Sequence, residues 1–299
     1  MRDLDRPPSL LSLYARAALR RGGSGPGAAG VPGAALRLTG QVPDADRVAS
    51  YARLCGERFG PDLPPLFPHL LGFPLQLALL TDPAAPFPAL GLVHVANHVE
   101  VVRGIPLGAA VDVEVEMTPV RPHRKGRTVD LVARAALAGE VVWRSASTYL
   151  RRGEGATPDD AATPDDGVTP DDGVTPDAAP AADGDDLRLG AVWRLPADLG
   201  RRYAAVSGDR NPIHLSAPTA RALGFPRAIA HGMWTAARCL AALEGRLAPP
   251  YAVDVDFRAP ILLPGTVELH TSVGAERARF AVRARGKDRT HLVGAATPL

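Results

Sequence analysis

An acidic and an imidazole side chain lie close together in the second half of the chain. Asp209 and His214 are five residues apart, with Asn211 and Pro212 between them. Pro212 disfavours a regular helix through this point and favours an extended conformation at Asn211. A carboxylate and an imidazole on one stiff loop can address the same water molecule, with one accepting a proton and the other donating it. The pattern therefore predicts that Asp209 and His214 catalyse the addition or removal of water.

A second feature follows at His231-Gly232-Met233, where an apolar helix is expected to begin. The first N–H groups of a helix have no acceptor within it and lie at its positive end. Because Gly232 has no Cβ, a ligand oxygen can approach its N–H closely. We expect this N–H to stabilise a developing oxyanion, although close packing of the helix on a sheet is an alternative explanation. We interpret His231 as a structural residue at the beginning of the helix.

Hydrophobic periodicity predicts the elements that position these residues. Apolar residues at helical spacing indicate helices at 70–80 and 233–243, the second with Thr235 and Arg238 on its polar face. Alternating apolar and polar residues indicate antiparallel strands, expected at 93–101, 111–117, 129–135, 141–150, 251–257, 267–273, 278–284 and 291–296. One helix followed by several antiparallel strands, found twice, predicts an α+β fold.

The chain contains an internal repeat with an offset of 152 residues. Segment 51–57 matches segment 203–209, and Gly72-Phe73-Pro74 matches Gly224-Phe225-Pro226. The domains expected are an N-terminal extension at 1–40, a first half at 41–152, a linker at 153–186 and a second half at 187–299. At this offset the first half has substitutes for every site residue of the second half: Glu57 for Asp209, Phe59 for Asn211, Asp62 for His214, and Leu79 and Leu80 for His231 and Gly232. We therefore expect one active site per chain.

The linker is a proline-containing acidic repeat, in which Thr-Pro-Asp-Asp recurs every six residues from Thr157. It holds 11 of the 32 acidic residues, so the remainder has 34 basic against 21 acidic residues and a charge of +13. A basic body suits an anionic small molecule, and the absence of basic runs interleaved with aromatics argues against nucleic acid. The two cysteines, Cys55 and Cys239, suggest neither a disulfide framework nor a zinc site. With no targeting signal or membrane span recognised, a cytoplasmic protein is expected.

The stretch SGDRNPIH at 207–214, followed by GF at 224–225 and AHGM at 230–233, resembles the signature of MaoC-like (R)-specific enoyl-CoA hydratases, also called hydratase 2. The first half resembles the degenerate hotdog of two-domain members, which include 3-hydroxyacyl-thioester dehydratases. The resemblance implies a double hotdog, in which each half is a long helix wrapped by an antiparallel sheet. It also implies a lyase of fatty acid metabolism that reversibly hydrates trans-2-enoyl-CoA or -ACP to the (R)-3-hydroxyacyl thioester.

The same resemblance implies roles for individual residues. Asp209 and His214 would hold the catalytic water, Asn211 would orient the pair, and the Gly232 N–H would bind the thioester oxygen. No metal or cofactor is implied beyond the CoA or acyl carrier protein of the substrate, and the first half would supply architecture and room for the acyl chain.

Several alternatives stay open at this point. A hotdog acyl-CoA thioesterase and a non-catalytic acyl-thioester-binding subunit are the rival functions, although thioesterases typically lack the SGDxNPIH loop. The sequence does not decide which of Asp209 and His214 is the acid, nor whether the chain is a homodimer or a pseudo-dimeric monomer. Four arginines on one expected strand face are consistent either with binding CoA phosphates or with a solvated surface: Arg277, Arg279, Arg283 and Arg285.

Overall fold

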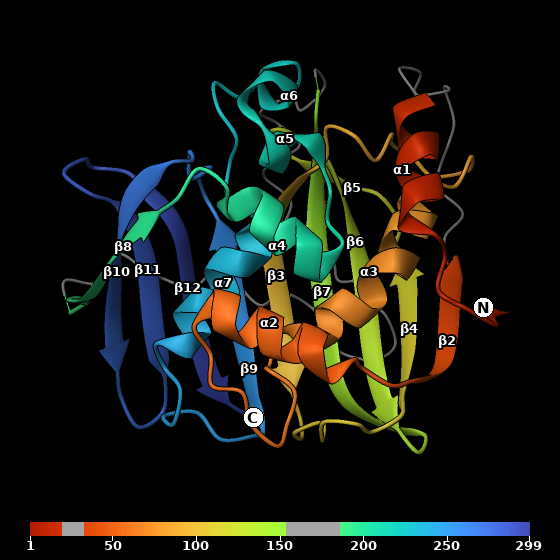
Figure 1. Ribbon diagram of the computed structural model, residues 1–299, viewed down its shortest axis with the longest axis horizontal. Coiled ribbons are helices and arrows are strands. Elements are labelled where there is room, and N and C mark those ends of the chain that lie inside the picture. The colour runs from red at the N-terminus through yellow and green to blue at the C-terminus, as the bar shows by residue number, and fades with distance from the viewer. Residues whose placement is uncertain (20–32, 154–185) are drawn as a thin grey trace.

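Two sets of antiparallel strands, one from each half of the chain, join edge to edge in the computed structural model (Figure 1). The structure describes residues 1–19, 33–153 and 186–299. The linker expected at 153–186 therefore lies, apart from its two end residues, outside the described residues. Among the helices that are described, none combines the length and the hydropathy needed to cross a membrane.

The first half begins with β1 (Arg2–Leu4), α1 (Leu10–Leu19) and β2 (Ala35–Gln41). It continues with α2 (Ala45–Cys55), α3 (Phe67–Leu80), β3 (Val93–Val101), β4 (Val111–Met117), β5 (Arg121–His123), β6 (Gly126–Leu137) and β7 (Glu140–Arg152). The second half contains β8 (Arg188–Leu195), α4 (Leu199–Ser207), α5 (Pro212–Leu215), α6 (Ala217–Arg221) and α7 (Gly232–Ala241). It ends with β9 (Tyr251–Phe257), β10 (Gly265–Val273), β11 (Ala278–Ala284) and β12 (Thr290–Pro298).

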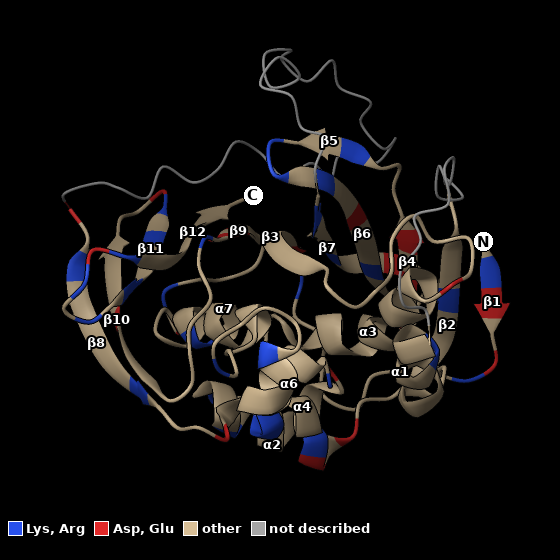
Figure 2. Cartoon of the chain, turned by 90° about the horizontal axis from the view of Figure 1, so that it is seen from above, with Lys and Arg blue, Asp and Glu red and all other residues tan. Residues whose placement is uncertain are grey.

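The described strands form one 12-stranded sheet with the order β1-β2-β4-β6-β7-β3-β9-β12-β11-β10-β8, and β5 pairs with β6. β3 and β9 pair antiparallel at the centre, and the strands follow the same sequence outward on both sides. Figure 2 shows the strands as an arc with α3 and α7 in its hollow. Each half is thus a helix wrapped by an antiparallel sheet, and the expected α+β double hotdog is confirmed.

The period-two pattern located the strands closely, even though β6 and β12 contain runs of consecutive buried residues. β3, β4, β9 and β11 have the predicted bounds, and the other four predicted strands extend a few residues further. In β4 the valines are buried while the acidic residues between them are half-buried. β2 pairs with β4, so the sheet of the first half includes residues before the expected boundary at 41.

The predicted polar face of α7 is wrong at Thr235. This side chain is only 2% exposed, and its hydroxyl donates a hydrogen bond to the His231 carbonyl one turn earlier. The Trp234 indole N–H donates to the Leu54 carbonyl of α2, while the Arg238 guanidinium donates to the Cys55 carbonyl and lies over the Trp193 ring. Because α2 and the sheet together surround α7, polar residues of this helix bond within the protein rather than face water.

The repeat holds structurally at the ends of α2 and α4. Both helices end at a glycine in the left-handed conformation, Gly56 with φ 71° and Gly208 with φ 83°. The constant offset then fails, because the second half inserts α5 and α6 at 212–221 before its central helix, and the first half has no counterpart. Gly72 consequently lies inside α3, whereas Gly224 lies after α6. Leu79 and Leu80 lie in the last turn of α3, not at its beginning, so the proposed match to His231 and Gly232 is wrong.

Glu57 follows the α2 turn at the position that corresponds to Asp209. Both of its carboxylate oxygens are buried, with no hydrogen-bond partner among the described residues. Burial, and secondarily the nearby Glu244, raises the pKa of Glu57 to about 8 from an ordinary value of 4.5. The counterpart of Asp209 is therefore a protonated, enclosed carboxyl group near neutral pH.

This environment makes a prediction about stability. Between pH 4.5 and about 8 the folded chain keeps the Glu57 proton that the unfolded chain releases, so Glu57 makes the free energy of unfolding fall as pH rises. Glu57→Gln should reduce this fall, measured by denaturant unfolding at pH 5 and pH 8. Glu276→Gln, at an exposed position, serves as the control. Equal pH dependence in Glu57→Gln and wild type would contradict the assignment.

Candidate active site

The loop between α4 and α5 carries two of the predicted site residues, Asp209 and Asn211. α4 ends at Gly208, and α5 begins at Pro212, the first helical position, where a missing N–H costs nothing. Asn211 caps this helix in an extended conformation (φ −55°, ψ 125°), and its side-chain oxygen accepts from the Ile213 N–H at 3.4 Å. The expected extended Asn211 is confirmed, but Pro212 starts a short helix rather than a loop. This helix holds His214.

Asp209 is fixed by its own loop. Its N–H donates to the Ser207 hydroxyl at 3.1 Å, and its Oδ1 accepts from the Asn211 N–H at 3.0 Å. Its side chain is 28% exposed and lines a cavity. Asn211 therefore orients Asp209 through its backbone N–H, while its side chain caps α5.

His214 is buried on α5, and one hydrogen bond defines its tautomer. Its Nδ1 lies 2.8 Å from the Ile229 carbonyl oxygen. Because a carbonyl oxygen only accepts, Nδ1 carries the proton, and in the neutral ring Nε2 holds a lone pair. The imidazole is thus oriented as a proton acceptor at Nε2.

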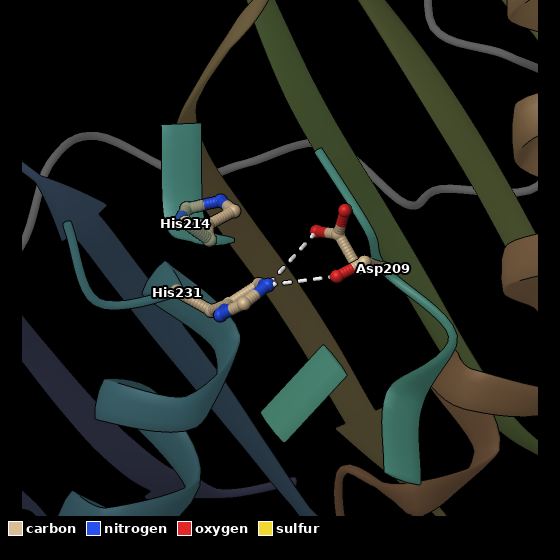
Figure 3. Close-up of side chains that lie close together, drawn as sticks. All are labelled: Asp209, His214 and His231. Atoms are coloured by element: carbon tan, nitrogen blue, oxygen red, sulfur yellow. Dashed lines mark hydrogen bonds and ion pairs between the residues drawn. The ribbon is translucent and has the colours of Figure 1, made fainter. Parts of the chain in front are cut away.

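His231, interpreted from the sequence as a structural residue, lies beside His214 and points toward Asp209 (Figure 3). Its ring stacks on that of His214 with centroids 3.6 Å apart and an interplanar angle of 24°. Its Nε2 lies 3.0 Å from the Asp209 carbonyl oxygen and 3.7 Å from Oδ2. His231 is also the N-cap residue of α7. It connects the beginning of the central helix to the Asp209 loop, which is a structural role at the centre of the site.

Burial determines the protonation of this cluster near neutral pH. Burial lowers the pKa of His214, and burial together with His214 lowers the pKa of His231 to about 3. Burial alone raises the pKa of Asp209, but the two histidines, the Asn211 N–H and the Tyr14 hydroxyl outweigh it, so the pKa is lowered. The site therefore holds an ionised carboxylate beside two neutral imidazoles.

Asp209, His214 and His231 each offer one metal-ligand atom, and these atoms lie within 4.8 Å of one another. The two rings are stacked nearly parallel, so their in-plane lone pairs run side by side rather than toward one point. Nitrogen ligands of a metal direct their lone pairs at the ion. His231 Nε2 is in addition engaged with the Asp209 carbonyl. The arrangement fits proton transfer better than metal coordination.

Gly232 is the first residue of α7 and lines the same cavity. A Cβ at this position would lie 2.8 Å from Cε1 of Phe257, a contact too close to exist without a shift of the ring. Close packing of α7 against strand β9 therefore favours glycine at position 232, as the alternative explanation from the sequence expected. The absence of a side chain also leaves the Gly232 N–H, a helix-terminal donor without an intrahelical acceptor, beside the cavity.

The cavity has a volume of about 1310 Å³ and is lined by both halves. The lining from the first half includes His69 from α3, His94 from β3 and Tyr149 from β7. His94 stacks on Tyr149 with centroids 4.7 Å apart and contacts Phe257 at 4.9 Å. Sequence reasoning missed these residues, because their positions along the chain show no relation to the Asp209 motif.

Tyr14 was also missed. It lies on α1 in the N-terminal extension, yet its hydroxyl is 3.1 Å from Asp209 Oδ1. A separation of 195 residues gives no local signal that the two side chains meet.

Comparison with known proteins agrees with this geometry. The family model of the MaoC like domain matches residues 186–293. The chain is 34% identical to 3-hydroxyacyl-thioester dehydratase X of Mycobacterium tuberculosis over 249 residues, which is 83% of this chain and 84% of that protein. It is 35% identical to 3-hydroxybutyryl-CoA dehydratase of Methylorubrum extorquens over 125 residues, which is 38% of this chain and 80% of that protein.

Solved structures give the same result. A crystal structure of HtdX from Mycobacterium tuberculosis superposes with a TM-score of 0.75 at 32% identity, covering 89% of this chain and all of that one (100%). A MaoC-like dehydratase from Phytophthora capsici shares the fold, with a TM-score of 0.66 at 17% identity over 89% of this chain and 94% of that chain. The identity and coverage of the mycobacterial relative establish that this chain belongs to the MaoC-like dehydratase family.

Proposed function

We propose that this chain reversibly hydrates trans-2-enoyl thioesters to (R)-3-hydroxyacyl thioesters. The observation that carries the proposal is the pair of Asp209 and His214, which line one cavity together with Gly232 at the beginning of α7. Hydro-lyase chemistry on acyl thioesters agrees with the family and with the two related dehydratases from Mycobacterium tuberculosis and Methylorubrum extorquens. The (R) configuration rests on the resemblance of the 207–214 motif to hydratase 2.

The protonation of the resting site constrains the mechanism. Asp209 is ionised and His214 is neutral with a free lone pair at Nε2, so neither is an acid before water arrives. During hydration one of the two takes a proton from the bound water as its oxygen bonds to C3. The π electrons of the C2–C3 bond move toward the thioester carbonyl, and C2 then receives a proton. The proton given to C2 therefore originates from the water, and dehydration runs the same steps in reverse.

The enolate formed between these steps needs a donor at the thioester oxygen. The Gly232 N–H lies at the positive end of α7 and lines the cavity together with Asp209 and His214. A donor fixed before the reaction begins stabilises developing negative charge without reorganisation. We therefore assign the oxyanion role to this N–H, with Phe257 packed against its Cα and enforcing the glycine.

The coenzyme A portion of the substrate needs a binding surface for its phosphate groups. Five exposed cationic residues line the cavity where it meets solvent, and we call them the basic rim: Arg121, Arg124, Lys125, Arg152 and Arg258. Figure 2 shows the basic residues on β5 and the turn after it. None of the four arginines considered from the sequence at 277–285 is among the described residues that line the cavity, and Arg279 pairs with Asp186. We place the phosphates of coenzyme A at the basic rim.

The rival functions are less well supported. A thioesterase needs a water positioned at the thioester carbonyl carbon, whereas Asp209 and His214 lie in the segment that matches the MaoC like domain. A non-catalytic binding subunit gives no reason for an ionised carboxylate and a lone pair at the cavity wall. Both cysteines are buried free thiols, which suits the reducing cytoplasm that we propose as its location.

Removal of either catalytic group should abolish most of the turnover. Asp209→Asn and His214→Ala should each lower kcat for crotonyl-CoA hydration by about 10²–10⁴-fold, measured by loss of enoyl absorbance. The double variant should lose little more, because the two act on one water. Glu57→Gln, at the corresponding position of the first half, is the matched control and should keep nearly normal kcat. A collapse of kcat in Glu57→Gln alone would mean that the first half has a working site.

The configuration of the product tests the proposed function directly. With the thioester oxygen at Gly232 and water between Asp209 and His214, only one face of C3 meets the water. Hydration of crotonyl-CoA should give (R)-3-hydroxybutyryl-CoA by chiral chromatography, and coupling to an (S)-specific 3-hydroxyacyl-CoA dehydrogenase should yield little NADH. Release of free thiol without hydration would identify a thioesterase, and rapid NADH formation would exclude the (R) assignment.

Charge reversal at the basic rim tests the carrier site. The double variant Arg124→Glu/Lys125→Glu should raise KM for crotonyl-CoA by about tenfold with little change in kcat, because surface ion pairs contribute up to about 1 kcal/mol each. KM for the crotonyl thioester of N-acetylcysteamine, which has no phosphate, should not change. Arg277→Glu/Arg285→Glu makes the same charge change away from the cavity and should behave as wild type. Equal KM effects on both substrates would argue against phosphate binding at the rim.

A further inference from the structure

Helix α1 lies outside both hotdogs but packs against the Asp209 loop. Leu13 and Ala17 are the buried residues of this helix, which contacts α3 (Figure 1). Leu10 at its beginning covers Gly208, where an added Cβ would lie 2.5 Å from the leucine Cδ1. The turn that leads into Asp209 is therefore covered by a segment from the other end of the chain.

Tyr14 makes the polar contacts of this helix with the site. Its hydroxyl donates to Asp209 Oδ1 at 3.1 Å and accepts from the Arg210 N–H at 2.7 Å. Oδ1 also accepts from the Asn211 N–H at 3.0 Å, so the loop and α1 both hold the same oxygen. Oδ2, the other carboxylate oxygen, faces His231 Nε2 at 3.7 Å. With Oδ1 occupied by two donors, Oδ2 is the oxygen left to handle a proton.

We propose that Tyr14 is a positioning residue of the active site, which fixes the Asp209 carboxylate so that Oδ2 meets the water, and that α1 completes the site. This inference rests on the proposed function, in which Asp209 acts on that water. The hydroxyl bridges the carboxylate and the next backbone N–H, so it fixes both the side chain and the loop. A ring without the hydroxyl can fill the same space but supplies neither bond.

The hydroxyl also favours the ionised form of Asp209. Burial and the Asp209 charge raise the pKa of Tyr14 far above its usual range, so it donates at every working pH. Seven titratable side chains surround Asp209 from the elements packed around it: Tyr14, His69, His94, Tyr149, Tyr203, His214 and His231. Of these, Tyr14 is the one whose side-chain hydrogen bond lowers the pKa of Asp209. Removing this hydroxyl should raise the pKa of the carboxylate.

Tyr14→Phe tests the proposal, because it deletes the hydroxyl and keeps the ring. We expect kcat for crotonyl-CoA to fall about tenfold, since a hydrogen bond to a charged group contributes about that factor or more. KM should change little, and the acid limb of the kcat/KM pH profile should move to higher pH, because Asp209 must be ionised. Ser12→Ala removes a hydroxyl from the exposed side of α1 and should match wild type.

A purely structural role predicts a different result. Leu13→Ala loosens the packing of α1 without touching the hydroxyl, and should lower Tm while the acid limb stays in place. A Tyr14→Phe variant with the lowered Tm of Leu13→Ala and an unmoved acid limb would overturn the proposal, as would wild-type kcat. Absence of hydration by the wild-type chain would instead contradict the proposed function, so the two failures are distinguishable.

Discussion

The antiparallel pairing of β3 with β9 is the interaction on which the rest of the structure depends. It runs from Ala96 opposite Asp256 to Val101 opposite Tyr251 and joins the strands of the two halves into one sheet. Buried valines of both strands pack on one side, and His98 Nδ1 lies 2.7 Å from Asp254 Oδ1 across the seam. Because β3 carries His94 and β9 carries Phe257, the same pairing brings the first half to the wall of the second-half cavity. One chain thus builds a site that neither half encloses alone.

The two halves share the same arrangement of a sheet around a central helix. They differ in the segment that leads into that helix, between α2 and α3 in the first half and between α4 and α7 in the second. In the second half, residues 208–231 form the Asp209 turn and two short helices and end at a histidine that caps α7. In the first half, the chain passes from Gly56 to α3 through segment 57–66, which has no such helices. Glu57 is consequently enclosed without a hydrogen-bond partner among the described residues, whereas Asp209 faces a cavity. The two carboxyl groups thus occupy corresponding positions but different environments.

Asp209 combines exposure to the cavity with firm orientation. It contacts the Asn211 N–H of its own loop, the Tyr14 hydroxyl of α1 and His231 at the beginning of α7. Donors that favour the charged form oppose the cost of burial. His214 is oriented differently, by the single carbonyl of Ile229, which leaves its other nitrogen free to accept. Preorganisation of both groups before substrate binds is what a proton-transfer site requires.

Features that depend on neighbouring residues could be predicted from the sequence. It predicted Asp209, Asn211 and His214 as site residues because they lie close together along the chain, and it placed several strands to the residue because a half-buried strand alternates with a fixed period of two. The folded structure was needed to show that His231 stacks on His214, that Tyr14 reaches Asp209, and that the first half lines the cavity. It also showed that a constant repeat offset fails once α5 and α6 are inserted. Local periodicity and turn chemistry act over a few residues, whereas contacts between distant segments arise only when the sheet and helices pack together.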